Sequence, residues 1–464
     1  MFNEDTLKKN ILIIGAGPAG LTAGYVLSKH DYSICFIEKE EEVGGLAKTL
    51  QKGELKLDIG PHILWADHDS EMNEFIQELM GEQLFEYYPS GKRYLEDVLV
   101  GEKKYHYPIQ ITNALKNAGL HNSIRYLRDY LFRDYTIIDD GKSNYEFALI
   151  KHLGRSLSQL FLTDICQKTY GFTADNLSSD LMKRVDRFSI LIILKEQINS
   201  IFDRLKKRGD KVNYPYGGIG QICNSLKEKI GDNVNWCLSS KPTNINIIDN
   251  KVISVTYLNN DGCEKTIHPE HIISTIPLYS LMNIITPRPE NNIIEAAINL
   301  KYRSHIAIYI VFKTSQIMKN HDIYISNPEV PFVRIMEQKH YCDNLIPGDN
   351  KTVLTVEYIC WNTDNLWMIN DDELYELTKH WLKKLSIISN QEVIEYFTHR
   401  ENDAYPVYDK EYSKYRNLIK KYIENINNLD SIGRAGEFIY ATQYEAMRRG
   451  RESAEMIINK NMRK

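Results

Sequence analysis

The chain has 464 residues, of which 43% are hydrophobic and 26% are charged. This length is sufficient for about three domains, and this composition is typical of globular proteins. The net charge of −5 argues against a nucleic-acid partner, which requires a basic surface. No apolar run approaches the roughly 20 residues that cross a bilayer, so no transmembrane segment is predicted. The longest run, Phe188–Leu194, fits a buried helix or a monotopic surface patch.

The seven cysteines are scattered along the chain and form no CxxC motif. An odd number of cysteines without pairing or metal-ligand spacing indicates reduced thiols and predicts no metal site. The first ten residues are polar and do not resemble a secretory signal peptide. We therefore expect a cytoplasmic location.

The first predicted elements are a buried parallel strand at Ile11–Ile14, a glycine-rich turn and a helix at Leu21–Lys29. The turn has the pattern GxGxxG, in which each glycine has a separate role. Gly15 forms the tight turn, Gly17 lets a pyrophosphate approach the backbone, and Gly20 allows the helix to pack closely on the strand. The helix N-terminus would hold the pyrophosphate, because its N–H groups and its dipole favour an anion.

A second strand, Ser33–Ile37, ends at Glu38, whose carboxylate is placed to accept hydrogen bonds from an adenosine ribose. The order of these features, from the first strand through the glycines and the helix to the second strand and its acid, predicts a dinucleotide site. A plain glycine-rich surface turn would leave Glu38 unexplained. A second glycine pair follows at Gly44-Gly45, and then the segment Asp58-Ile59-Gly60-Pro61-His62. Together these features resemble the FAD-dependent amine-oxidase superfamily, which includes protoporphyrinogen oxidases, carotenoid desaturases and UDP-galactopyranose mutases.

The resemblance implies FAD as the cofactor, because Gly44-Gly45 would allow the second close backbone approach that the long ribityl–pyrophosphate chain of a flavin needs. A middle glycine turn at 213–222 returns the chain to the FAD domain in the superfamily. A third motif at 431–440 again combines a strand, a glycine turn and a helix N-terminus. The residues expected to bind FAD are Gly15, Gly17, Pro18, Ala19, Gly20, Glu38, Lys39, Gly44, Gly45, Leu46, Gly60, Pro61, His62, Gly433, Arg434 and Tyr440.

The predicted fold class is α/β, with a discontinuous Rossmann-type FAD-binding domain, a helical insertion and an antiparallel-sheet substrate domain. FAD-binding segments are expected at 1–62, 206–290 and 416–464, a strand and helical domain over the flavin at 63–205, and the substrate domain at 291–415. The remaining predicted elements are a helix at 70–80, a largely helical region at 111–205, a hairpin of 236–247 and 252–257, and antiparallel strands at 306–312, 323–326, 333–338 and 353–359.

Several residues are candidates for chemistry. His62 belongs to the GxH stretch Gly60–His62, which lines the isoalloxazine in relatives, so the resemblance implies that it faces the flavin near N5; it would equally cap a turn. Tyr324 and Arg334 stand ten residues apart, and Tyr405 and Tyr440 follow downstream. This set resembles the diphosphate-binding residues of eukaryotic-type UDP-galactopyranose mutases, where an arginine meets two phosphate oxygens at once. The plain alternative is that Arg334 pairs with a carboxylate.

Arg184 is a candidate for the second arginine of a mutase, although a structural role is slightly favoured. The sequence departs from the mutases at Gln221–Cys223, where they carry a tryptophan. We therefore predict an FAD-dependent oxidoreductase that transfers a hydride from a small organic substrate to flavin N5, with His62, Arg334 and Tyr440 as catalytic residues. The alternatives are a mutase that acts on a nucleotide sugar without net redox change, and a flavin-binding protein without turnover. The predicted substrate-binding residues are Arg184, Tyr324, Arg334, Tyr405 and Tyr440.

Overall fold

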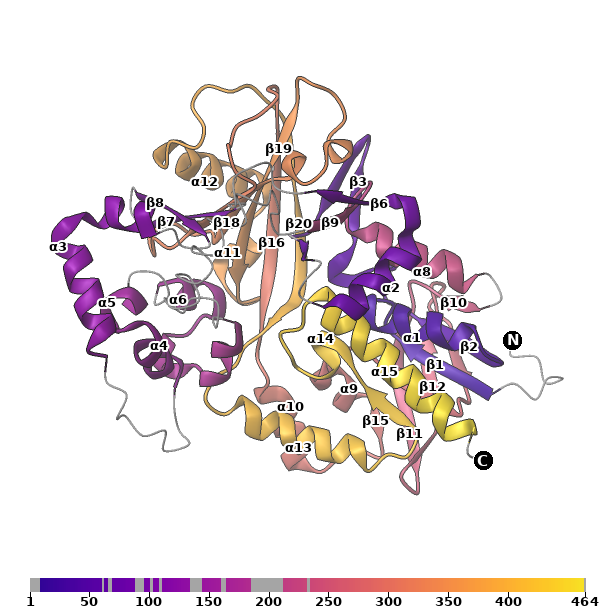
Figure 1. The fold of residues 1–464 in the computed structure, drawn as a ribbon. Helices are drawn as coiled ribbons and strands as arrows, with labels where there is room; N and C mark the ends of the chain where they lie inside the picture. Colours follow the sequence, from indigo (N-terminus) through magenta and orange to yellow (C-terminus); the bar gives the residue numbers. More distant parts are fainter. Residues whose placement is uncertain are drawn as a thin grey trace.

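The computed structural model describes residues 9–60, 62–65, 69–87, 96–100, 103–107, 111–133, 144–159, 164–184, 212–231 and 234–462. These residues form a parallel sheet with helices at one end, a seven-stranded sheet in the middle and a group of helices at the other end (Figure 1). The predicted α/β class is confirmed. Within these ranges, no helix combines the length and the apolar character needed to span a membrane.

The parallel sheet collects five short strands from distant parts of the chain. Its order is β10-β2-β1-β14-β21, and all neighbouring strands run parallel. Both ends of the chain and its middle therefore contribute to one sheet, as the predicted discontinuous fold requires. The strands are β1 Lys9–Ile14, β2 Tyr32–Ile37, β10 Asn235–Cys237, β14 His271–Ser274 and β21 Leu429–Ser431.

The two faces of this sheet are covered by different layers, because alternate side chains of a strand point to opposite faces. Ile11 and Phe36 pack with the helices of one layer, whereas Leu12 and Ile37 pack with a small second sheet. The helices of the first layer are α1 Pro18–Ser28, α2 Ser70–Met80, α8 Gly220–Ile230 and α15 Gln443–Met462.

The small second sheet has four strands in the order β13-β12-β11-β15. The predicted hairpin is confirmed for β11 and β12, and its turn residues Asp249 and Asn250 have positive φ, 49° and 57°. The predicted start of the hairpin at Trp236 is wrong. Trp236 lies in β10 of the parallel sheet, where its ring stacks on Phe36 with the centroids 4.4 Å apart. The strands are β11 Lys241–Ile248, β12 Lys251–Leu258, β13 Glu264–Ile267 and β15 Ile285–Thr286.

The seven-stranded sheet has the order β20-β16-β19-β18-β17-β7-β8. The four predicted antiparallel strands are confirmed as β16 to β19. The strand β20 was not predicted, because its sequence carries charged residues without apolar alternation, yet it pairs along the fully buried β16. β7 joins the sheet by pairing parallel to β17. The strands are β7 Glu96–Val100, β8 Lys103–Tyr107, β16 Tyr302–Phe312, β17 Asp322–Ile325, β18 Arg334–Glu337, β19 Thr352–Cys360 and β20 Val393–Pro406.

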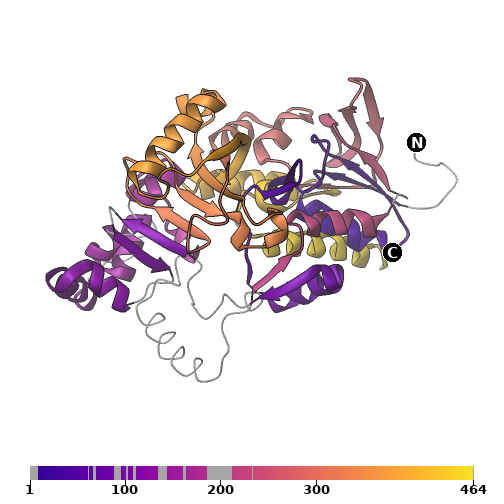
Figure 2. The ribbon, with the colours of Figure 1, turned by 90° about the horizontal axis from the view of Figure 1, so that it is seen from above.

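Helices α3 to α6 lie at the end of the molecule farthest from both termini, as Figures 1 and 2 show. The predicted helical region is largely helical in its described parts, with isolated β-bridges at Asn144, Leu177 and Ser178. Residues 185–205, with the run Phe188–Leu194, lie outside the described ranges. These helices are α3 Ile111–Leu131, α4 Tyr145–Leu153, α5 Arg155–Ser158 and α6 Asp164–Tyr170. The remaining elements include β3 Thr49–Lys52, β4 Leu55–Asp58, β5 Leu64–Trp65, β6 Leu84–Tyr87, β9 Val212–Pro215, α9 Leu278–Asn283, α10 Asn291–Asn299, α11 Asn365–Met368, α12 Asp371–Lys384, α13 Tyr412–Glu424 and α14 Gly433–Gly436.

The contact between α1 and α15 depends on a glycine. A Cβ atom placed on Gly450 would lie 2.1 Å from the backbone oxygen of Ala19 and 3.0 Å from the backbone nitrogen of Ala23. Backbone atoms in a packed helix cannot move aside as a flexible side chain can. The C-terminal helix is therefore held against the first glycine motif by close backbone packing.

We expect Gly450→Ala to lower the free energy of unfolding by about 1–3 kcal/mol, because the added methyl group overpacks this contact. Met456→Ala, at an exposed position of the same helix, is the control and should change stability by less than about 0.5 kcal/mol. Urea denaturation measures both. Equal stability of Gly450→Ala and the unchanged protein would contradict the close packing.

Candidate functional site

The first glycine motif contains two glycines that the fold itself requires and one that it does not. Gly15 has φ +99°, and a Cβ there would lie 2.2 Å from Thr275 Oγ1. A Cβ on Gly20 would lie 2.1 Å from the Gly15 carbonyl oxygen. No described atom lies within 4 Å of a Cβ placed on Gly17. The space beside Gly17 is therefore open to a ligand at the N-terminus of α1.

The second and third glycine motifs converge on the same helix N-terminus. The Gly44 N–H donates to the Ala16 carbonyl at 2.8 Å, and a Cβ on Gly45 would lie 3.4 Å from the Gly17 Cα. In the third motif, Gly433 has φ +81°, and its Cβ would lie 2.9 Å from that of Ala19. Three separate segments of the chain thus approach the start of α1 through glycines.

Glu38 lies beside this turn at the end of β2. Its buried carboxylate accepts hydrogen bonds from the backbone N–H groups of Ala16 (2.6 Å) and Glu40 (3.0 Å). Lys39, also expected to bind the cofactor, has an exposed side chain that pairs with Glu40 at 3.3 Å. Among the described residues, no side chain caps the N-terminus of α1. An uncapped helix start, an open glycine and an adjacent acid fit a dinucleotide with its pyrophosphate.

Three neighbouring strands of the seven-stranded sheet bring a tyrosine, an arginine and a glutamate side by side. Tyr324 is the cross-strand partner of Arg334, and Arg334 is the cross-strand partner of Glu357. Such partners share one face of a sheet. Arg334 Nη1 donates to the Tyr324 hydroxyl at 2.8 Å, Nε donates to Glu357 Oε2 at 2.5 Å, and Nη2 contacts the same oxygen. Arg334 therefore pairs with a carboxylate and also contacts a candidate tyrosine.

The charge of Arg334 is compensated within the protein. Glu357 is fully buried, and its Oε1 lies 3.0 Å from His305 Nε2. Burial would raise the pKa of Glu357, but Arg334 and His305 hold it below its ordinary value. Burial would lower the pKa of Arg334, but Glu357 holds it well above its ordinary value. A second buried carboxylate, Asp322, also interacts with the Arg334 charge, and burial raises the pKa of Asp322 to about 7.

Arg434, within the third glycine motif, contacts two aromatic rings. Its Nε donates to the Ala404 carbonyl and its Nη1 to the Ala441 carbonyl, both at 2.9 Å. The guanidinium lies 5.2 Å from the ring centroid of Tyr405 and 4.2 Å from that of Tyr440, within the range of cation–π interactions. Burial raises the pKa of Tyr405, so its hydroxyl stays protonated and neutral.

His62 lies between these groups and the second glycine motif. It is half-buried, bonds to the backbone of Leu46 and lies near the charges of Glu357, Arg334 and Arg434. Burial and the two arginines lower its pKa to about 4, against the opposing effect of Glu357, so the imidazole is neutral at pH 7. The following residues are called the polar cluster: His62, Tyr324, Arg334, Glu357, Tyr405, Arg434 and Tyr440.

The segment 58–62 ties the polar cluster to the glycine turns. A Cβ on Gly60 would lie 3.2 Å from Glu357 Oε1. The buried carboxylate of Asp58 accepts the N–H of Ile219 in the middle glycine turn at 3.1 Å, and its carbonyl accepts Gln338 Nε2 at 2.8 Å. Burial raises the pKa of Asp58 to about 6. This segment therefore joins the dinucleotide-binding fold to the seven-stranded sheet.

Some candidate residues are not placed by the structure, and others were missed. Pro61 lies outside the described residues, and Arg184 ends the helix η5 (Ser179–Arg184) with a side chain that also lies outside them. Glu357 and His305 were not predicted, because sequence spacing does not reveal which strands are neighbours. The available signal was an acid within the otherwise apolar or small run Thr352–Cys360.

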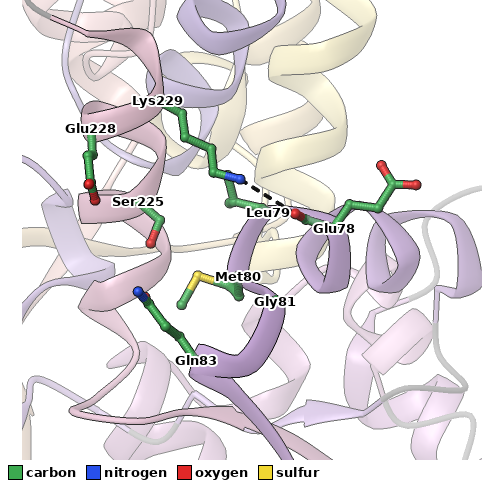
Figure 3. Close-up of a pocket in the computed structure, with 8 residues that line it drawn as sticks. All are labelled: Glu78, Leu79, Met80, Gly81, Gln83, Ser225, Glu228 and Lys229. Atoms are coloured by element: carbon green, nitrogen blue, oxygen red, sulfur yellow. Dashed lines mark hydrogen bonds between the residues drawn. The ribbon is translucent and has the colours of Figure 1, made fainter.

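A separate surface pocket lies between the end of α2 and α8 (Figure 3). There, Lys229 Nζ donates to the Glu78 carbonyl at 3.5 Å. The pocket shares no residue with the glycine motifs or the polar cluster, so it is not the candidate site. Its lining residues are Glu78, Leu79, Met80, Gly81, Gln83, Ser225, Glu228 and Lys229.

Parts of the chain are similar in sequence or in fold to known proteins. Residues 13–79 match the family model of an NAD(P)-binding Rossmann-like domain. The chain is 23% identical over 277 residues to an L-amino-acid oxidase of Sistrurus catenatus edwardsii, over 57% of this chain and half the length of that relative. Its fold is similar to that of reduced UDP-galactopyranose mutase, with a TM-score of 0.76 and 18% identity over 98% of this chain and 94% of that chain. It is also similar to that of a putrescine oxidase variant, with a TM-score of 0.63 and 16% identity over 98% of this chain and 99% of that chain. The predicted resemblance to the FAD-dependent amine-oxidase superfamily is confirmed.

We expect Glu357→Gln to lower the free energy of unfolding by about 3–5 kcal/mol, because it leaves the buried Arg334 charge without its partner. The double variant Arg334→Met/Glu357→Gln should recover most of this loss, since it removes both charges. Urea denaturation of the three proteins measures the effect. A double variant no more stable than Glu357→Gln would show that the ion pair is not the cause.

The lowered pKa of His62 predicts a pH dependence of stability. The unfolded chain binds a proton at this imidazole near pH 6.5, whereas the folded chain binds it only near pH 4. The free energy of unfolding of the protein should therefore decrease as the pH falls from 8 to 5. This decrease should exceed that of His62→Asn by about 1–2 kcal/mol. Urea denaturation at both pH values tests this difference. Parallel pH profiles of the two proteins would refute the lowered pKa.

Proposed function

We propose that the chain is an FAD-dependent oxidoreductase of the amine-oxidase type that acts on a small organic substrate. The pyrophosphate of FAD would lie at the N-terminus of α1 beside Gly17, and Glu38 would bind the adenosine ribose. Gly45 and Gly433 would keep side chains away from the dinucleotide. The observation that supports this binding mode is the convergence of three glycine motifs on one helix start. Bound FAD would accept a hydride from a C–H bond and pass the electrons to oxygen.

The polar cluster would bind and orient the substrate. Tyr324 and Arg334 offer hydrogen-bond donors fixed by their mutual contact and by Glu357. Tyr405 and Tyr440 offer ring faces and neutral hydroxyl groups, held in place by Arg434. His62, neutral at pH 7, adds a polar group without adding charge. We propose Arg334, Tyr440 and His62 as the residues in contact with the reacting group.

The observation that carries this proposal over a mutase is the ion pair of Arg334. A diphosphate requires cations that are free to neutralise it, because buried charge without a partner is costly. Arg334 is already neutralised by Glu357, and Arg434 is bonded to two backbone carbonyls. A cluster with little excess charge suits an apolar or zwitterionic substrate. The similarity to L-amino-acid oxidases supports the same choice.

The second candidate function is that of a nucleotide-sugar mutase that uses reduced FAD. Two observations favour it. The first is that one cluster contains the candidate diphosphate-binding residues Tyr324, Arg334, Tyr405 and Tyr440. The second is that the fold is similar to that of reduced UDP-galactopyranose mutase. For this function, Arg334 would have to exchange Glu357 for a phosphate oxygen.

Gly17→Ala should separate cofactor binding from folding. Its added methyl group meets no described atom, so stability should change by less than about 1 kcal/mol, whereas FAD affinity should fall at least about tenfold. Gly20→Ala is the matched comparison and should destabilise the fold itself, because its methyl group meets the Gly15 carbonyl. Thermal unfolding and titration of the apoprotein with FAD give the two readouts. Unchanged FAD affinity of Gly17→Ala would refute the proposed pyrophosphate site.

Anaerobic stopped-flow measurements test the proposed reaction. Primary amines and L-amino acids are mixed with the FAD-loaded protein, and at least one compound should bleach the flavin absorbance. Tyr324→Phe should slow this reduction by about tenfold, because it removes the hydroxyl that Arg334 holds. Tyr396→Phe, outside the polar cluster, is the control and should leave the rate unchanged. The proposal fails if no amine or amino acid reduces the flavin.

A further inference from the structure

The second half of α3 exposes its apolar face. The helix is interrupted at Gly119, where φ is 75° and ψ is 164°, and continues from Leu120 to Leu131. Leu120, Ile124, Leu127 and Leu131 recur at intervals of four, three and four residues, so they form a single stripe. Between 56% and 80% of the surface of each is exposed, and the adjoining Phe132 is 82% exposed. These five residues are called the α3 stripe.

The side of the same helix that meets the protein carries polar groups together with the buried Ala118 and Tyr130. Asp129 accepts a hydrogen bond from Ser156, and a Cβ on Gly154 would lie 2.6 Å from the Asp129 carbonyl oxygen. Tyr130 is buried beside this contact, whereas Asn122 bonds to the helix backbone. A helix on a soluble protein normally buries its apolar face and exposes its polar face. In this segment all four aliphatic side chains are exposed, which indicates that the α3 stripe is covered by something outside the described chain.

The charges around the α3 stripe are predominantly basic. Between residues 111 and 132 the only acid in the sequence is Asp129, which accepts a hydrogen bond from Ser156 and lies 3.7 Å from Arg128. Lys116, Arg125 and Arg128 are exposed, so basic residues outnumber acids on this helix. Strand β8 packs against α3, and Lys103 Nζ of β8 donates a hydrogen bond to the Asn117 carbonyl of α3 at 2.5 Å. The whole chain carries a net charge of −5, so the helix α3 has the opposite sign to the chain average. Charge complementarity therefore favours an anionic partner.

We propose that the α3 stripe docks on an anionic lipid surface. The apolar side chains would enter the boundary between headgroups and acyl chains, and Arg125 and Arg128 would contact lipid phosphates. The segment from Leu120 to Leu131 has a length of about 18 Å and lies at the edge of the molecule, away from both termini (Figure 1). A second copy fits less well, because a symmetric contact through this face would bring two basic rims together.

Flotation of the full-length protein with lipid vesicles tests the proposal. It should float with vesicles of phosphatidylcholine and phosphatidylglycerol and bind at least about tenfold more weakly to phosphatidylcholine alone. High salt should weaken the binding, because it screens the contacts of the arginines.

Two double variants separate the contributions. Leu127→Ser/Leu131→Ser removes two of the five apolar side chains of the α3 stripe and should abolish flotation. Arg125→Glu/Arg128→Glu should reduce flotation by about tenfold or more. Ile298→Ser, at a similarly exposed apolar position on α10, is the control and should float like the unchanged protein. Circular dichroism confirms that each variant is folded.

Three outcomes would overturn the proposal. The first is no flotation with anionic vesicles at low salt. The second is flotation that survives Leu127→Ser/Leu131→Ser in a folded protein. The third is a concentration-dependent dimer, seen by light scattering, that Leu127→Ser/Leu131→Ser abolishes, since this would assign the α3 stripe to a second copy.

Discussion

The buried ion pair between Arg334 and Glu357 determines the character of the candidate site. Glu357 lies in the fully buried strand β19, and its carboxylate bonds to Arg334 on β18 and to His305 on β16. It therefore links three adjacent strands, and a Cβ on Gly60 would lie 3.2 Å from its Oε1. Because the guanidinium is neutralised from within, its remaining donors can orient a substrate without demanding an anionic one. Removal of either partner would leave a buried charge that several kcal/mol of other interactions would have to offset.

Glycines serve two different purposes at the dinucleotide-binding end of the molecule. Gly15, Gly20 and Gly450 are required by the protein itself, since a methyl group at each would collide with atoms of the chain. Gly17 is different, because its missing side chain leaves space that no described atom fills. The first glycine motif thus combines close helix packing with an open surface for a pyrophosphate. In the third motif, Arg434 of the polar cluster directly follows Gly433.

The parts of the fold that the sequence predicts depend on local chemistry. The turn at Gly15–Gly20 and the alternating strands β16 to β19 have patterns that only a few structures satisfy. Strand β20 could not be predicted, because its polar residues are ordered by pairing with β16 and not by burial of an apolar face. Tyr324 and Arg334 were identified by resemblance, but Glu357 was not, since only the strand register places it beside Arg334.

The most direct test of the account is the binding of UDP to the FAD-loaded protein after reduction with dithionite, measured by calorimetry. Arg334 is held by Glu357, so we predict no heat beyond that of dilution, both in the unchanged protein and in Arg334→Ala. Tight binding of UDP that is lost in Arg334→Ala would contradict the account. It would show that Arg334 leaves Glu357 to bind a diphosphate, and it would make the chain a nucleotide-sugar enzyme.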